Sequence, residues 1–273
     1  MPFKPQKGVY YRMPVFFGPT PGPRQFRGIE QYDYATEAHM RVIGARFLTD
    51  RDMLQAWLPS GFAVWGEPVA TCEVTYIDRL AWLAGRGYNW CDFKFNVVFD
   101  GKHGPTHGTF LVVRFEDLPD PILSGREELG HNKLWCAIPP IREVSGKCAT
   151  EMSWLGTTFW KIAAWDLRDE SVVPKHDPKN SGVLSYKYMP RTGEWGTPDI
   201  AYTTLTPTST AGKLLRYQVG NGSVEFPKIS WEELPTLHHL AEAFAALPQI
   251  ESRGGYVMEI QGGASGVATR IVE

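Results

Sequence analysis

The sequence predicts a mainly β fold with a few helices, and three features of the chain carry this prediction. Apolar and polar residues alternate along many short runs, which is typical of strands with one buried face. Clusters of Gly, Pro and Asn separate these runs at fairly regular intervals. Helical periodicity is confined to a few segments. Many short strands at such spacing are typical of an antiparallel sandwich or barrel.

The first part of the chain predicts an irregular arm, a strand and a helix. Residues 1–35 form the arm, which is rich in Pro, Gly and aromatic residues that need burial. A strand is expected over 39–47. A helix follows from Thr49, its expected N-cap, with an acid three residues later in the manner of a capping box. Pro59 ends this helix.

The rest of the chain predicts strands, interrupted by one long helix. The expected helix runs from about 231 to 247, with Ser230 and Glu233 as its capping box. Gly220-Asn221-Gly222 is expected to be a hairpin turn, and Asp100-Gly101 and Gly104-Pro105 are turn signals. The expected strands cover residues 69–77, 91–99, 109–115, 134–141, 150–155, 158–165, 183–188, 201–205, 214–219 and 256–260.

The composition limits the class of protein. Of the 273 residues, 43% are apolar and 13% aromatic, enough to bury a substantial core. The 28 basic and 30 acidic residues are mixed along the chain and give a formal net charge of −2. Such a chain has no strongly basic surface for a phosphate backbone, so we expect no nucleic-acid partner.

Nothing in the sequence indicates a membrane or an oxidising compartment. No apolar run approaches the ~18 residues needed to span a bilayer, and none near the N-terminus is long enough for a signal peptide. The cysteines form no C-x-x-C pair, which favours reduced thiols in a cytoplasmic protein. We expect no metal site, because Gly104 and Pro105 lie between His103 and His107 and preclude a helix that would align them.

The segment from Gly125 to Lys133 carries the strongest functional signal. Ser124 and Glu127 are spaced as a capping box for a short helix, and Gly130 is suited to its left-handed C-cap. Lys133 then opens the apolar run 134–138. Burial in an apolar site lowers the pKa of an ammonium. A free amine attacks ketones to form a Schiff base, which is an electron sink for making or breaking a C–C bond.

Gly125, Arg126, Glu127 and Lys133 stand at the spacing of the active-site segment of acetoacetate decarboxylases, and the chain resembles that family. The resemblance extends more weakly over most of the sequence. It implies a single domain over 1–273 with the family's curved antiparallel β-barrel or cone, assembled as a homo-oligomer. It also implies that Lys133 is the Schiff-base residue and that no cofactor is needed.

The sequence departs from the family pattern beside this lysine. In the decarboxylases a second lysine follows the reactive one and helps to lower its pKa, whereas Leu134 stands here. His131 and Asn132 replace an aromatic residue and a proline. Without the second cation, we expect only desolvation to adjust the pKa of Lys133, with Trp90 and Trp135 as the apolar surroundings.

These departures favour Schiff-base chemistry over decarboxylation itself. We expect a pyruvate-like keto acid as substrate, with an aldehyde as the possible second reactant in an aldol condensation and dehydration. Such chemistry needs an acid or base, for which Tyr256 and Glu259 are the candidates. Substrate-binding candidates are Arg126, Glu127, Tyr88, Trp90 and His131, although an Arg126–Glu127 ion pair that only fixes the loop is the favoured reading of those two residues.

Two alternatives stay open from the sequence. One is a decarboxylase of a β-keto acid such as acetoacetate. The other is a non-catalytic barrel that binds an apolar small molecule, in which Lys133 is charged and paired, for example with Glu127 or Glu259. The lyase requires Lys133 to be unprotonated in an apolar pocket with a proton carrier nearby.

Overall fold

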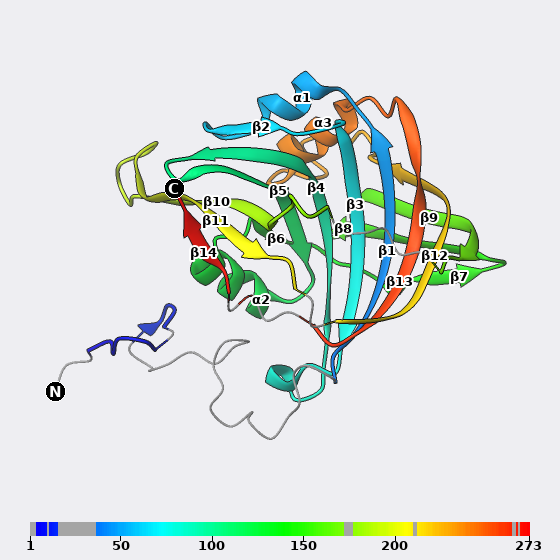
Figure 1. Ribbon diagram of the computed structural model, residues 1–273, viewed down its shortest axis with the longest axis horizontal. Helices are drawn as coiled ribbons and strands as arrows, with labels where there is room; N and C mark the ends of the chain where they lie inside the picture. Colours follow the sequence, from blue (N-terminus) through cyan, green and yellow to red (C-terminus); the bar gives the residue numbers. More distant parts are fainter. Residues whose placement is uncertain are drawn as a thin grey trace.

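The computed structural model describes residues 4–9, 11–15, 37–171, 177–209, 212–263, 266 and 268–273. Most of the expected arm at 1–35 lies outside these residues. A single large curved sheet organises the fold, with the strand order β14-β11-β10-β5-β4-β3-β1-β13-β12-β9-β8-β7 (Figure 1). Two short strands join it at the side, since β2 pairs with β4 and β6 pairs with β5.

The strands span much of the described chain. Their bounds are β1 (His39–Leu48), β2 (Phe62–Val64), β3 (Val69–Asp78), β4 (Tyr88–Gly101), β5 (Gly104–Glu116), β6 (Lys133–Trp135), β7 (Arg142–Val144), β8 (Lys147–Trp154), β9 (Thr157–Asp169), β10 (Gly182–Pro190), β11 (Pro198–Pro207), β12 (Lys213–Glu225), β13 (Glu251–Gln261) and β14 (Arg270–Val272).

The sheet confirms the mainly β class but differs from a closed antiparallel barrel. The strand order ends at β14 on one side and β7 on the other, so the sheet is open. Two of its pairings, β5 with β10 and β5 with β6, are parallel. Both involve the strands next to the lysine segment. The expected strand over 134–141 is only the three-residue β6, which holds Lys133 at its first position.

The helices are shorter than the sequence predicted. Asp50, not Thr49, caps α1 (Arg51–Ala56), because its carboxylate accepts the Met53 amide at 2.9 Å. Helix α3 (His238–Ala246) begins seven residues after position 231, although Glu233 does accept the Ser230 amide as expected. The other helical segments are α2 (Pro119–Ser124), the 3₁₀ turn η2 (Ala81–Leu83) and the π-helical turn η3 (Gly125–Leu129). No helix of the described chain is long and apolar enough to cross a membrane.

The predicted turn at Gly220-Asn221-Gly222 is wrong, because all three residues lie inside β12. A register shift at this point bends the strand against β9. A Cβ on Gly220 would collide with the carbonyl oxygen of Trp165, and one on Gly222 would collide with the backbone of Gly255. The glycines are therefore present for close approach of neighbouring strands rather than for a turn.

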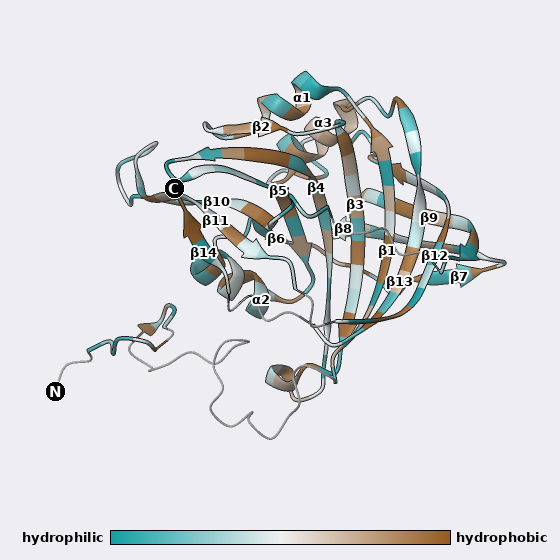
Figure 2. Ribbon diagram, in the orientation of Figure 1, coloured by the Kyte–Doolittle hydropathy of each residue, from teal (hydrophilic) through white to brown (hydrophobic). Residues whose placement is uncertain are grey.

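The main core lies on one face of the sheet, where α3 packs against it. Phe93 and Phe244 stack with ring centroids 4.9 Å apart, and Trp160 lies 5.7 Å from Phe244. All three side chains are almost fully buried. The alternation of brown and teal along the strands in Figure 2 shows the period of two that separates this face from the other.

Candidate active site

The pairing register brings charged residues together on the face opposite the main core. Lys133 pairs with Arg114 on β5, Arg114 with Asp92 on β4, and Asp92 with Glu73 on β3. Residues paired across neighbouring strands point to the same side of a sheet. One cross-strand row therefore begins Lys133–Arg114–Asp92, and we call it the lysine row.

The helical segment α2–η3 covers Lys133 and holds it in place. Ser124 lies inside this continuous segment rather than capping it, so the expected N-cap is wrong; its hydroxyl donates to the Pro121 carbonyl. Gly130 ends the segment with φ of 75°, as expected for a left-handed C-cap. A Cβ on Gly125 would collide with Cε and Nζ of Lys133. The lysine side chain thus lies directly against the helix backbone.

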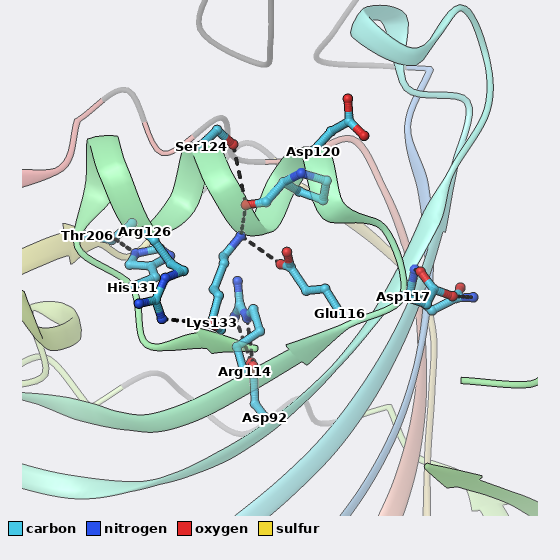
Figure 3. A network of polar contacts seen from close by, with 12 residues as sticks. Asp92, Arg114, Glu116, Asp117, Asp120, Ser124, Arg126, His131, Lys133 and Thr206 are labelled. Atoms are coloured by element: carbon cyan, nitrogen blue, oxygen red, sulfur yellow. Dashed lines mark hydrogen bonds and ion pairs between the residues drawn. The ribbon is translucent and has the colours of Figure 1, made fainter. Parts of the chain in front are cut away.

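Lys133 is buried and has two polar contacts at its amine. Nζ donates to the Pro121 carbonyl oxygen at 2.9 Å and lies 2.7 Å from Oε1 of Glu116 (Figure 3). Burial lowers the pKa of Lys133 to about 8; Glu116 opposes this shift and the Arg114 charge adds to it. An appreciable fraction of this amine is unprotonated near neutral pH, which is the form that attacks carbonyl groups.

The carboxyl group of Glu116 contacts this amine, and Glu116 was not among the site residues predicted from the sequence. Its side chain is fully buried. Burial raises its pKa, while Lys133 and Arg114 oppose that shift. Within the described residues, Oε2 has no hydrogen-bond partner. Burial thus shifts the pKa of this carboxyl group upward and that of the amine downward, and the two groups lie 2.7 Å apart.

Arg114 supplies a positive charge that lowers the pKa of Lys133, in place of the second lysine that Leu134 replaces. Its Nε and Nη2 donate to the two oxygens of Asp92 at 2.6 and 2.7 Å, and its guanidinium lies 5.2 Å from the centre of the Trp90 ring. The expectation that desolvation alone adjusts Lys133 is therefore wrong, since the second cation comes from the neighbouring strand. The sequence signal for Arg114 and Glu116 was the presence of two charged residues in an otherwise apolar strand.

A cavity of about 390 Å³ opens onto Lys133. Its polar lining lies around the lysine and includes Arg114, Ser124, His131 and Thr206. The rest is mostly apolar or glycine: Ala38, Met40, Ile77, Leu80, Trp82, Tyr88, Trp90, Leu129, Val183 and Ile260, with Pro121, Gly125, Ser209, Gly212, Gly263 and Gly266. The volume and the apolar lining are typical of small-molecule sites.

Three of the predicted substrate-binding residues line this cavity, namely Tyr88, Trp90 and His131. Nε2 of His131 lies 2.8 Å from the Thr206 hydroxyl. Arg126 and Glu127 lie outside the lining. Arg126 donates to the carbonyl oxygen of Lys133 at 2.9 Å, and the Glu127 carbonyl accepts from Lys187 at 2.6 Å. Both therefore fix the loop through backbone contacts, and no ion pair joins their two side chains in the described structure.

Tyr256 and Glu259 lie away from the cavity. Tyr256 is at the far end of the lysine row, which continues through Glu73 and Gly44 to β13. Its hydroxyl donates to Glu73. Five strand steps of about 4.8 Å place it roughly 24 Å along the sheet from Lys133. Glu259 pairs with Arg41 and Arg216 and faces the opposite side of β13 from Tyr256.

The described part of the N-terminal arm reaches the helical segment above the lysine. Nε of Arg12 lies 3.4 Å from a carboxylate oxygen of Glu128, and Nη1 donates to the Asp120 carbonyl oxygen at 3.5 Å. Arg12 is 7% exposed. The arm is thus attached to both α2 and η3, the two pieces that cover Lys133.

The open curved sheet holds a buried lysine beside a mostly apolar cavity, which is typical of a small-molecule site, and comparison with known proteins identifies the family. The family model for acetoacetate decarboxylase matches residues 12–252. The chain therefore belongs to the acetoacetate decarboxylase family and is an enzyme of that family. No individual curated protein matches it significantly.

Several solved structures share this fold. The enduracididine biosynthesis enzyme MppR complexed with pyruvate is 16% identical, with a TM-score of 0.63 over 86% of this chain and 88% of that one. The acetoacetate decarboxylase of Legionella pneumophila is 17% identical, with a TM-score of 0.61 over 93% and 92%. An acetoacetate decarboxylase-like enzyme of Sphingomonas wittichii is 15% identical, with a TM-score of 0.61 over 89% and 94%.

Proposed function

We propose that this protein is a cofactor-independent lyase in which Lys133 forms a Schiff base with the carbonyl carbon of a small, pyruvate-like keto acid. The single observation that carries the proposal is the buried Lys133 amine, with its pKa lowered to about 8, at the wall of a cavity. A lysine in such surroundings is the activated nucleophile that carbonyl chemistry requires.

Glu116 is proposed to move the protons of this reaction. Lys133 attacks the carbonyl carbon and forms a carbinolamine. Protonation of its hydroxyl then releases water and leaves an iminium ion. Glu116 contacts the reacting nitrogen, and burial raises the pKa of its carboxyl group, which favours the protonated form. During hydrolysis of the product iminium, Glu116 can take a proton from the attacking water and give it to the amine nitrogen as that nitrogen leaves.

Arg114 is proposed to bind the carboxylate of the keto acid. Asp92 accepts from Nε and Nη2, and Nη1 takes no part in that pair. Arg114 lines the cavity and is the cross-strand neighbour of Lys133. A carboxylate held there would place the adjacent carbonyl carbon near the amine, because the two groups are joined by one bond in a 2-keto acid.

Aldol condensation followed by dehydration is the branch that we favour. The apolar cavity has room for a second reactant beyond a pyruvate-sized acid. Among the similar structures, MppR was complexed with pyruvate and with the condensation product of pyruvate and imidazole 4-carboxaldehyde. Family membership supports a second candidate, decarboxylation of a β-keto acid such as acetoacetate. Because Arg114 supplies a cation, Leu134 alone does not decide between the two.

Borohydride trapping tests the proposal. The protein is incubated with pyruvate or with acetoacetate, reduced, and analysed by intact and peptide mass spectrometry. We expect a mass increase on Lys133 that is absent in Lys133→Ala. Lys94→Ala is the matched control, because Lys94 lies on the same sheet face and is paired with Glu73. Release of CO₂ from acetoacetate would favour the decarboxylase. No labelling between about pH 6 and 9, the range for a desolvated lysine, would favour a non-catalytic binding protein.

A further inference from the structure

Three aromatic side chains form a continuous wall that leads away from the lysine row. The Arg114 guanidinium lies against Trp90. The Trp90 and Tyr88 ring centroids are 5.6 Å apart, and those of Tyr88 and Trp82 are 6.2 Å apart. All three side chains line the cavity and are half-buried. We call these three residues the aromatic wall.

The neighbours of the aromatic wall are apolar. Tyr88 continues across the sheet through Ile77 and Met40 to Ile260, all of which line the cavity. Leu80, beside Trp82, adds to this surface. The charged side chains of the lining, Lys133 and Arg114, both lie in the lysine row. A charged group at the Trp82 end of the wall would lose its water, and the described residues of the lining place neither Lys133 nor Arg114 at that end.

The wall also extends along β4 away from the Asp92 that holds Arg114. Trp90 and Tyr88 are two and four residues along β4 from Asp92, which is about 7 and 13 Å at the rise of a strand. A keto acid bound at Lys133 and Arg114 would occupy the part of the cavity beside these two residues. The part lined by Trp82 and Tyr88 would then hold the group that becomes attached to the keto acid.

We propose that the aromatic wall binds the second reactant, and that this reactant is an uncharged aryl aldehyde. This inference rests on the proposed Schiff-base function. Aromatic rings that stack or meet edge to face gain an interaction beyond that of their buried area. An aryl ring that lies against the aromatic wall gains this interaction, which a short alkyl aldehyde does not.

The reaction balances without an oxidant or a further cofactor. The enamine formed from pyruvate on Lys133 attacks the aldehyde carbon and makes one C–C bond, and the aldehyde oxygen takes a proton. Loss of that hydroxyl and of a proton from the former methyl carbon releases water and forms a C=C bond. Hydrolysis of the iminium then frees an arylidene pyruvate and the amine. The net change is pyruvate plus aldehyde to unsaturated keto acid plus water.

The first test uses the unmodified protein with pyruvate and three aldehydes. Benzaldehyde represents the aryl class, acetaldehyde the short alkyl class, and glyoxylate the charged class. Product is followed by the ultraviolet absorbance of the conjugated keto acid and by mass. We expect kcat/KM for benzaldehyde to exceed that for acetaldehyde at least ~10-fold, as expected for one well-packed ring, and glyoxylate to be the poorest. Equal values, or a preference for glyoxylate, would overturn the inference.

Variants test whether the aromatic wall causes the preference for benzaldehyde. Trp82→Leu keeps an apolar side chain but removes the ring, so KM for benzaldehyde should rise ~10-fold relative to acetaldehyde. Trp195→Ala is the matched control, because Trp195 is 86% exposed on the β10–β11 connection. An unchanged benzaldehyde preference in Trp82→Leu would overturn the assignment of the wall. Trapping of pyruvate on Lys133 is measured in parallel: its absence in the unmodified protein would overturn the proposed function as well, whereas trapping without an aryl preference overturns this inference alone.

Discussion

The two faces of the same strands have opposite chemistry. On one face of β4, Phe93 packs with Trp160 and Phe244 in the main core. On the other face, the adjacent Asp92 holds Arg114 beside Lys133 and Glu116. A single residue step along the strand thus separates the aromatic core from the charged site. The pleat, which directs successive side chains to opposite faces, is what allows one strand to serve both.

The two faces contribute differently to stability. Burial of the aromatic core removes apolar surface from water and stabilises the fold. Burial of Lys133 and Glu116 costs desolvation that their attraction offsets only in part. The shifted pKa values of these two groups reflect that cost. We therefore expect substitutions on one face to change stability and substitutions on the other to change reactivity.

Glu116→Gln should give the largest effect on the charged face. Loss of the proton carrier should slow labelling of Lys133 by pyruvate and borohydride ~10²–10⁴-fold. Since the Glu116 charge raises the pKa of Lys133, its removal should also move the midpoint of the pH–rate profile to lower pH. The measurement is the initial labelling rate over about pH 6 to 9.

Arg114→Gln should shift the midpoint of the same pH–rate profile in the opposite direction. The Arg114 charge lowers the pKa of Lys133, so its removal should move the midpoint to higher pH. Glu151→Gln, in an exposed ion pair with Arg142, is the control for a surface carboxylate and should leave the profile in place. Midpoints that move together in the two site variants would contradict the electrostatic account of the lysine row.

Phe93→Ala should give the largest effect on the core face. Phe93 is fully buried, and truncation of such a ring lowers the free energy of unfolding by about 3–5 kcal/mol. Urea denaturation measures this loss, with the exposed Leu155→Ala as a control. Labelling of Lys133 per folded molecule should persist at low temperature. A loss of labelling greater than the loss of folded protein would show that the two faces are not separable.

Tyr256→Phe should give the smallest effect and decides the role of the far end of the lysine row. If Tyr256 only donates to Glu73, its removal should cost about 1 kcal/mol of stability and leave pyruvate labelling and turnover unchanged. Thermal unfolding and the condensation assay measure these quantities. A ~10²-fold fall in turnover would instead support the acid–base role that the sequence predicted for Tyr256.

Local patterns were sufficient to predict much of the fold. The alternation along 69–77 and 91–99 located β3 and β4, and the left-handed C-cap at Gly130 was found from the residue type alone. The turn at 220–222 was wrong because glycines that admit a neighbouring strand look the same in sequence as glycines that turn. Helix α3 was predicted too long because a capping pair at 230 and 233 can hold a turn that does not continue as a helix.

The lysine segment of the site was predictable because its residues are close in sequence: Lys133 and the covering segment 125–130 form one continuous stretch. Tyr88, Trp90 and His131 line the cavity, and their role in substrate binding stays a prediction. Arg114 and Glu116 were missed because their relation to Lys133 comes from the parallel pairing of β5 with β6. Pairing register depends on the whole sheet, so no local pattern contains it.

Gly125 has a consequence for anyone who redesigns this enzyme or transplants its lysine into another scaffold. The volume that a side chain at 125 would occupy is already taken by the lysine itself, so the two positions behave as one unit. If Lys133 were transplanted without a glycine at the position of Gly125, a Cβ there would collide with the lysine side chain and displace its amine from Glu116. The smallest transferable unit is therefore the nine-residue segment 125–133 together with the strand that carries Arg114 and Glu116.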